Sequence, residues 1–370
     1  LATLPEDPPA ETVQLLLQHF LPHADQVGFF LHKERFVSVA TSADAQHRTA
    51  HLSRALLNAV YLCGAHLSCI DTLTVHKPTL LARAVEAVSS DLAGHGRYPI
   101  THTIQAEVIL ANYFFCVGRM LEGKYHASAA VALVLSARLH KIRALFPSDR
   151  HPPADEPLDR IEEGERINAF WTVFALDKEW AVVSGTPSQL DGKDGPVAVD
   201  TPWPLDIEEY EYPGLAPEVR GSRTVHNFLH DVPSTCTWGT SFLAMRAKAA
   251  AVLEYATRLA TSVPELAYAE EVQRVSRVIE SFVASLPRIH SQLDTRDICH
   301  LLVIHTQAHV AMILLHRNAV EENNIIPYQC LNSARAAVTQ VIGQVDLHQL
   351  HFVDPILAVS DPIEPPVSRN

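Results

Sequence analysis

Apolar residues recur along this chain at spacings of three and four residues, whereas the strict alternation of a half-buried strand is nearly absent. In the segment 101–118, for example, Ile104, Val108 and Phe115 fall on one stripe of a helix. Hydrophobic residues make up 47% of the 370-residue chain, which is enough apolar surface for a large core. We therefore predict an all-α fold, a multi-helix globular domain of packed antiparallel helices with one long Pro-rich acidic loop.

The helical periodicity and its interruptions predict how the chain is organised. We expect a single all-helical domain over 1–360, with helical halves 11–184 and 238–358 joined by an irregular loop, 185–237, and followed by a tail, 361–370. Helices are expected near 11–21, 49–69, 77–94, 101–118, 121–142, 159–184, 238–261, 267–294, 297–322, 327–345 and 351–358.

The loop 185–237 contains seven prolines and an acidic cluster, which together prevent long regular elements. Its side chains Trp203, Tyr210, Tyr212 and Leu215 are large enough to anchor it on the helices. We therefore expect a loop laid partly on the helical body, with free disorder as the alternative. The acidic cluster is either a solvated surface or a lid or protein contact.

The net charge and the spacing of the cysteines limit the functions that we expect of this chain by itself. Its formal net charge of −13 would repel a phosphate backbone, so we expect no DNA binding by the chain itself. The six cysteines are scattered, and none pairs at the C-x-x-C spacing of a zinc or redox site. No apolar run approaches the roughly 18 residues that span a bilayer. We expect a soluble, intracellular protein with no catalytic residues, no metal, no cofactor and no membrane contact.

The stretch 162–191 is an apolar helix with a charged start, a Gly-Thr-Pro break and an acidic end. The elements of this pattern are Glu165, Arg166, Phe170, Trp171, Leu176-Asp177-Lys178, Ser184-Gly185-Thr186-Pro187 and Asp191. They resemble the signature of the middle homology region, the regulatory domain of fungal binuclear zinc-cluster transcription factors. Further segments are similar to other parts of that region, in the family's order, namely 29–36, 56–67, 103–106, 118–140, 309–317 and 330–335. At Lys178 and Thr186 the chain departs from the family's arginines.

The resemblance implies a helical regulatory domain that controls transcription in the nucleus and is not an enzyme. It implies as partners a small-molecule effector or a coregulator protein, and a homodimer is a further association to test. The family's six-cysteine zinc cluster, which binds DNA, is absent here and is expected upstream of Leu1, so zinc and DNA would contact only that missing module. The competing hypotheses are a ligand-free helical scaffold for dimerisation or protein contacts, and a helical enzyme that uses His305 and His309.

Asp177 lies midway along the signature helix, where a carboxylate needs a partner. We predict a structural ion pair with an arginine of another helix, Arg138, and keep an effector contact as the alternative. Lys178 points about 100° away from Asp177 around the helix. The other signature residues are expected to pack in the core and, at Gly185 and Pro187, to end the helix.

Three histidines are the best ligand candidates, because His305, His309 and His316 share one helical stripe. Core or interhelical histidines are the simplest interpretation, followed by a ligand pocket and then by a metal site. The metal interpretation is weakest because His-Thr-Gln-Ala-His lacks the glutamate of the metalloprotease motif. Phe115 and Trp171 are candidates for lining a cavity between central helices, with plain core packing as the alternative.

Two further expectations concern regulation and pH. A regulatory site is expected beside the signature helix, under the acidic loop that follows it. The chain has 21 histidines, and those that are buried neutral would weaken folding as the pH falls toward their ordinary pKa of about 6.5.

Overall fold

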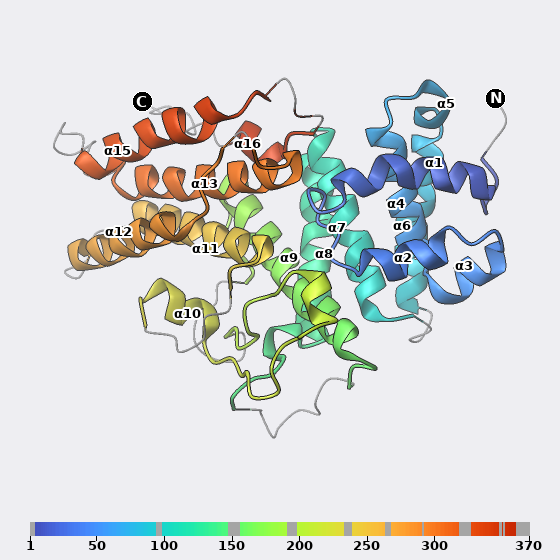
Figure 1. Cartoon of the computed structure of the whole chain (residues 1–370), viewed down its shortest axis with the longest axis horizontal. Helices are drawn as coiled ribbons and strands as arrows, with labels where there is room; N and C mark the ends of the chain where they lie inside the picture. Colours follow the sequence, from blue (N-terminus) through green and yellow to red (C-terminus); the bar gives the residue numbers. More distant parts are fainter. Residues whose placement is uncertain are drawn as a thin grey trace, which may run out of the picture. The chain divides into compact units, whose positions relative to one another are not determined.

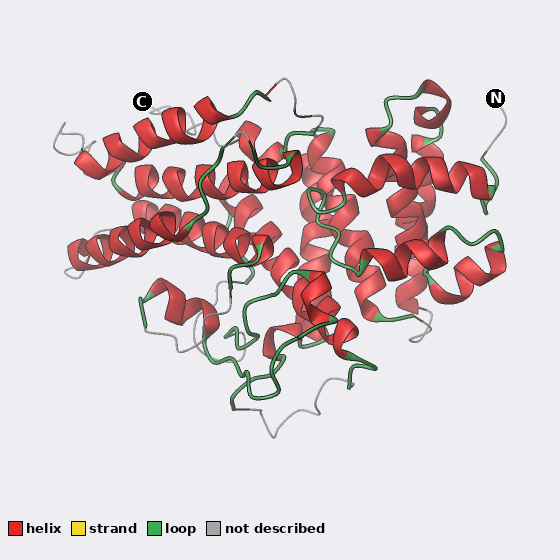
Figure 2. Cartoon of the chain, viewed as in Figure 1, coloured by secondary structure: helices red, strands yellow, loops and turns green. Residues whose placement is uncertain are grey.

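The structure is a computed structural model and it confirms the all-α class. Throughout the part that it describes, the regular elements are helices, and the only β-bridge is an isolated parallel one between Ala144 and Gly221 (Figures 1 and 2). The described residues are 4–93, 98–146, 156–190, 198–232, 239–262, 268–290, 292–317, 327–347, 350 and 352–359.

The chain divides into two compact units. Unit 1 comprises Leu1–Asp177 and Gln189–Lys248, and unit 2 comprises Lys178–Ser188 and Ala249–Asn370. Two of the three points at which the chain passes from one unit to the other fall inside helices, at 177/178 in the signature helix and at 248/249 in the helix Phe242–Thr261. The single domain over 1–360 stays a prediction.

Unit 1 is built around α4, which contacts α1, α6 and α7, while α7 also contacts α8. Helix α7 is buried along nearly all its length, because its apolar residues occupy most of its circumference. The regular elements of unit 1 before the signature helix are α1 (Ala10–Phe20), η1 (Leu21–His23), α2 (Lys33–Ala40), α3 (Ala45–His51), α4 (Arg54–Leu67), α5 (Asp71–Thr74), α6 (Lys77–Ala93), α7 (Ile100–Cys116), α8 (Met120–Ser136) and η2 (Leu139–Lys141).

The remaining elements follow from the signature helix onward, and in unit 2 the central one is α13, which contacts α12, α15, η4 and α16. They are α9 (Arg160–Ser184), η3 (Ile207–Tyr210), α10 (Thr224–Leu229), α11 (Phe242–Thr261), α12 (Tyr268–Ser285), α13 (Thr295–Leu315), α15 (Tyr328–Ala336), η4 (Ala337–Val341), η5 (Ile342–Gln344) and α16 (Pro355–Val359). Unit 1 holds η3, α10 and the first parts of α9 and α11.

Several helix boundaries differ from those predicted, and local backbone features explain two of them. The helix predicted over 49–69 is two helices, because Leu52 is extended and the Ser53 side chain accepts a hydrogen bond from the Leu56 backbone to cap α4. The helix predicted to reach residue 142 ends at Ser136, and Arg138 then adopts a left-handed φ of 57°.

The described parts of the loop from residue 189 onward belong to unit 1, and large side chains anchor them there, as expected. Tyr210 and Leu215 are buried and Trp203 is partly buried, which confirms three of the four predicted anchors. Tyr212 is not an anchor, since 87% of it is exposed. The loop also contains the short helix α10, which the proline content did not predict.

Candidate functional site

The charged start of α9 is held within unit 1 by hydrogen bonds and ion pairs. Glu165 is largely buried, its Oε1 accepts a hydrogen bond of 3.0 Å from the His32 backbone, and burial raises the pKa of its carboxyl. Arg166 pairs with Glu162 one turn earlier at 2.6 Å. The start of the signature helix is therefore joined to the rest of unit 1 through the contact of Glu165 with the His32 backbone.

Trp171 is fully buried, as is Phe170, and it fixes part of the loop that follows α9. Its Nε1 donates a hydrogen bond of 2.7 Å to the carbonyl oxygen of Pro202, and its ring stacks on Trp203 with 4.3 Å between centroids. Phe115 is also buried, and a Cβ on Gly123 would lie 2.5 Å from its ring. Both ligand candidates of unit 1 thus lie in tightly packed surroundings.

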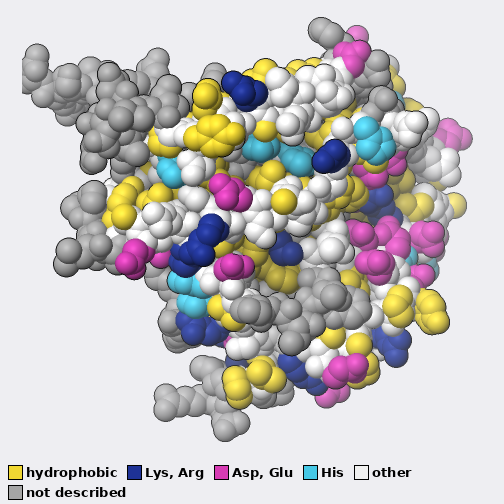
Figure 3. Space-filling view, turned by 60° about the vertical axis from the view of Figure 1, so that its left-hand side comes forward, with side chains coloured by type: hydrophobic (Ala, Val, Ile, Leu, Met, Phe, Trp, Pro, Cys, Tyr) yellow, Lys and Arg dark blue, Asp and Glu magenta, His cyan; other side chains and the backbone are white. Residues whose placement is uncertain are grey.

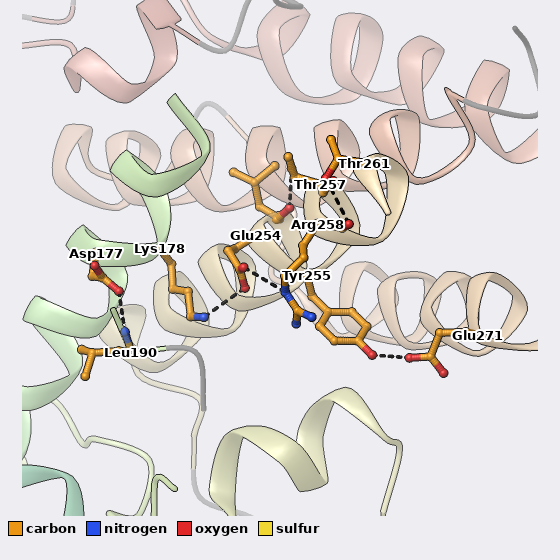
Figure 4. A network of polar contacts seen from close by, with 10 residues as sticks. Asp177, Lys178, Leu190, Glu254, Tyr255, Thr257, Arg258, Thr261 and Glu271 are labelled. Carbon is orange, nitrogen blue, oxygen red and sulfur yellow. Dashed lines mark hydrogen bonds and ion pairs between the residues drawn. The ribbon is translucent and has the colours of Figure 1, made fainter. Parts of the chain in front are cut away.

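Asp177 finds its partners in the backbone of the segment after the helix break. Its carboxylate accepts hydrogen bonds from the backbone of Gln189 at 3.2 Å and of Leu190 at 2.9 Å, the second of which is drawn in Figure 4. Gly185, at a φ of 60°, ends the helix in the conformation that favours glycine. The ion pair of Asp177 with Arg138 stays a prediction, and Asp191 lies outside the described residues.

A cluster of buried charges lies in unit 2, directly after Asp177 in the sequence. The ammonium of Lys178, 2% exposed, donates a hydrogen bond of 3.0 Å to Glu254, whose other carboxylate oxygen lies 3.2 Å from Arg258 Nε (Figure 4). Glu179 is 1% exposed and accepts a hydrogen bond of 2.8 Å from the amide of Gln307, which is also 1% exposed. We call the four buried residues Lys178, Glu179, Glu254 and Gln307 the unit 2 polar core.

The sequence analysis missed most of this polar core. It noted Lys178 as a departure from the family's arginine that points away from Asp177, and it did not single out Glu179, Glu254 or Gln307. One signal was present: Glu254 follows the run Ala249 to Leu253, where a lone carboxylate in an apolar stretch indicates a buried partner.

Of the three predicted histidines, His305 and His309 lie close together on α13 in unit 2, and His316 is the residue that caps the C-terminus of α13. The rings of His305 and His309 stack with 6.3 Å between centroids, and the His305 ring N–H donates to the carbonyl oxygen of Pro287 at 2.8 Å. Burial lowers the pKa of His305, and burial with the neighbouring His305 lowers that of His309 to about 4. His316 contacts Ser276 of α12 at 3.0 Å and thus joins two helices.

These histidines do not assemble a metal site with other ligands. Within the described parts of the chain, no group of three or more His, Cys, Asp or Glu side chains is placed to hold a metal ion. Because burial lowers the pKa of both histidines of the close pair, both are neutral near pH 7, and each ring offers one hydrogen-bond donor and one acceptor.

Among the buried polar atoms of α13, the side-chain oxygen Oε1 of Gln307 and the ring nitrogen Nδ1 of His309 have no hydrogen-bond partner within the described parts of the chain. Buried polar atoms in folded proteins are nearly always paired, since an unpaired one costs about 1–3 kcal/mol. Gln307 can therefore accept one further hydrogen bond from a small donor-bearing molecule while it holds Glu179.

Helix α13 is also long and apolar enough to cross a membrane by length and composition, with a mean hydropathy of 1.7 over its best window. However, 61% of that window is buried inside the structure, and the helix carries the histidines and Gln307. These features are typical of the central helix of a folded core.

One protein family is similar to this chain in sequence. The sequence profile of the fungal specific transcription factor domain matches residues 17–297, which include all of α9 and end inside α13. No curated protein and no solved structure matched the chain. The match confirms the resemblance inferred from the signature and leaves Gln307 and the three histidines outside the matched range. Because it covers well over half of the chain, this protein belongs to the fungal specific transcription factor domain family.

Proposed function

We propose that this regulatory domain of a fungal transcription factor responds to an effector, and that the unit 2 polar core with His309 is the place where it does so. The single observation that carries the proposal is the Gln307 side-chain oxygen, which is buried, lacks a donor and lies beside the buried carboxylate of Glu179. A small molecule bearing a hydroxyl, amide or ammonium group would supply that donor.

The proposed response is a population shift. A ligand that donates to Gln307 stabilises the arrangement in which α13 holds Glu179 and Lys178 holds Glu254. It shifts the protein toward that arrangement only by as much as its affinity differs between the two states. Helix α9 is the element expected to move when the ligand binds, because two residues of the polar core, Lys178 and Glu179, lie on it.

The test is a thermal-shift screen of the purified chain with polyols, hydroxy acids, amino acids and amines. A true effector raises the melting temperature of the wild type and of Gln14→Leu, an exposed glutamine on α1, but not of Gln307→Leu. Circular dichroism verifies that both variants are folded. If no compound stabilises the wild type, or if Gln307→Leu responds equally, sensing at this core is wrong.

The zinc, the DNA binding and the nuclear action expected of a zinc-cluster factor are properties of the whole protein. We infer that DNA and zinc are bound by a separate module, that the protein acts in the nucleus and that this domain itself is not an enzyme. Family membership and the net charge of −13, which opposes contact with phosphates, support this inference. An electrophoretic mobility assay in which this chain alone bound DNA specifically would contradict it.

A second candidate function is a scaffold that associates with a second copy of this chain. The observation in its favour is a set of exposed apolar side chains on α15, η4 and η5, namely Tyr328, Leu331, Val338 and Ile342. Figure 3 shows hydrophobic and charged side chains interspersed on the face that it brings forward, as is usual for non-obligate contacts. Light scattering across a concentration series, with Leu331→Glu as the disrupting variant, tests this candidate.

A further inference from the structure

Lys248 of α11 holds its ammonium group beside aromatic rings of unit 1. Its Nζ donates a hydrogen bond of 2.7 Å to the carbonyl oxygen of Gly239. The same nitrogen lies 5.0 Å from the ring centre of Trp203 and 5.8 Å from that of Phe228, within the range of cation–π attraction. All three side chains are half-buried, so the group is packed yet reachable from solvent.

The surroundings hold this amine in place. Trp203 stacks on the buried Trp171 and meets Phe228 edge to face, with 5.9 Å between the centroids of the last two rings. Gly239 has a φ of 109°, and a Cβ there would lie 2.8 Å from Lys248 Nζ and 3.0 Å from the Trp203 ring. The close approach of the amine to the backbone therefore depends on glycine at this position.

What distinguishes Lys248 is the absence of a counter-charge among the described residues. Lys33, Lys141 and Lys178 each lie within 3.0 Å of a carboxylate oxygen. Lys248 instead uses one of its three N–H groups, on a neutral carbonyl. Burial lowers the pKa of Lys248 to about 8, and no charged side chain among the described residues contributes to this shift.

We propose that Lys248, Trp203 and Phe228 form a binding site for a small organic monocarboxylate with an apolar body. The carboxylate would accept hydrogen bonds from the two unused N–H groups, and the apolar body would cover the half-exposed rings. One ammonium neutralises one charge, so the site suits a monoanion better than a phosphate dianion. It lies in unit 1 and does not rest on sensing at Gln307.

The site also implies a dependence of affinity on pH. The carboxylate binds the protonated amine, so binding raises the pKa of Lys248 and takes up a proton when the pH exceeds the value of about 8 in the free protein. The fraction of protonated amine falls about tenfold between pH 7 and pH 9 for a pKa near 8. The dissociation constant for a carboxylate should therefore rise about tenfold over that interval.

Benzoate is the probe that tests this site, titrated into the intact chain and followed by calorimetry and tryptophan fluorescence. Benzamide keeps the ring without the charge, acetate keeps the charge without the ring, and inorganic phosphate reports simple anion binding. We expect saturable benzoate binding at least about tenfold tighter than that of the other three, and weaker at pH 9 than at pH 7. Equal binding of phosphate, or affinity that does not change with pH, would overturn the proposal.

Matched variants locate the site. Lys248→Met keeps the apolar stem and removes the charge, and should abolish benzoate binding, whereas Lys33→Met, at a lysine paired with Asp25, should leave it unchanged. Gln307→Leu should also leave it unchanged, which separates this proposal from sensing in unit 2. Benzoate bound equally by Lys248→Met would place the site elsewhere. Should Lys248→Met fail to fold, the pH profile and the benzamide comparison of the wild type still decide the question.

Discussion

At the scale of single residues, the unusual feature of this protein is the consecutive burial of three charged side chains. Asp177 is satisfied by two backbone N–H groups, Lys178 by Glu254, and Glu179 by Gln307. Each charge has left water, and only a counter-charge or directed hydrogen bonds offset that desolvation. Sequence reasoning recognised that Asp177 needs a partner, but the donors come from backbone that carries no side-chain signal.

Removing one partner of the Lys178–Glu254 pair should be costly. Lys178→Met leaves Glu254 buried with Arg258 as the cation nearest to it, and we expect a loss of about 3–5 kcal/mol in the free energy of unfolding. Urea denaturation measures this loss. The double variant Lys178→Met, Glu254→Met removes both charges and should recover much of the stability, whereas additive losses in the double variant would show that the pair is not coupled.

At the scale of elements, close helix approach depends on small residues at particular positions. Gly64 lies where α4 crosses α1, and a Cβ there would lie 2.3 Å from the carbonyl oxygen of Leu16. The segment 56–67, which contains Gly64, is part of the resemblance to the family, but the sequence does not show which helix lies against it. The same holds for Gly123, which makes room for Phe115 between α7 and α8.

Gly64→Ala should therefore push α4 away from α1. The added methyl meets backbone, which cannot rotate aside as a side chain can, so we expect a destabilisation of about 1–3 kcal/mol despite the better helix propensity of alanine. Thermal unfolding followed by circular dichroism measures it. Ser90→Ala, at an exposed position on α6, is the control and should change stability by well under 1 kcal/mol. A neutral or stabilising Gly64→Ala would contradict the observed helix spacing.

At the scale of the whole molecule, histidines in both units connect stability to pH. Burial lowers the pKa of His102 in unit 1 to about 4, and burial with His305 lowers that of His309 in unit 2 to a similar value. Burial likewise lowers the pKa of His66, His305 and His316. These groups are neutral in the folded chain at a pH where the unfolded chain already binds protons.

Stability should consequently be greatest above pH 6.5 and be lost as the pH falls from about 6.5 toward about 4. Each such histidine adds up to about 1.4 kcal/mol of loss per pH unit inside this window. Glu165 has the opposite effect on stability, because burial raises the pKa of its carboxyl above the ordinary value of 4.5. This effect is confined to pH values near or above 4.5. Melting temperatures at pH 7.5, 6.0 and 5.0 test the trend.

A substitution tests whether buried histidines cause that trend. His102→Gln should flatten the decline in melting temperature between pH 7.5 and pH 5.0, because it removes a group that takes up a proton on unfolding. His47→Gln, at an exposed position, should leave the slope as in the wild type. A decline of the same steepness in His102→Gln would show that other groups cause the acid sensitivity.

The sequence by itself determined the helical class, the family and the positions of most long helices, because apolar spacing and terminators such as Gly185 act within a few residues of the chain. Only the tertiary structure decided which groups pair with Lys178 and Glu179, and that Lys248 meets a carbonyl oxygen and aromatic rings. Glu254 and Gln307 come from helices far away in the sequence, and the rings around Lys248 come from a loop and a short helix. Burial of a charge and the identity of its partner depend on packing between distant segments, and no local pattern encodes that.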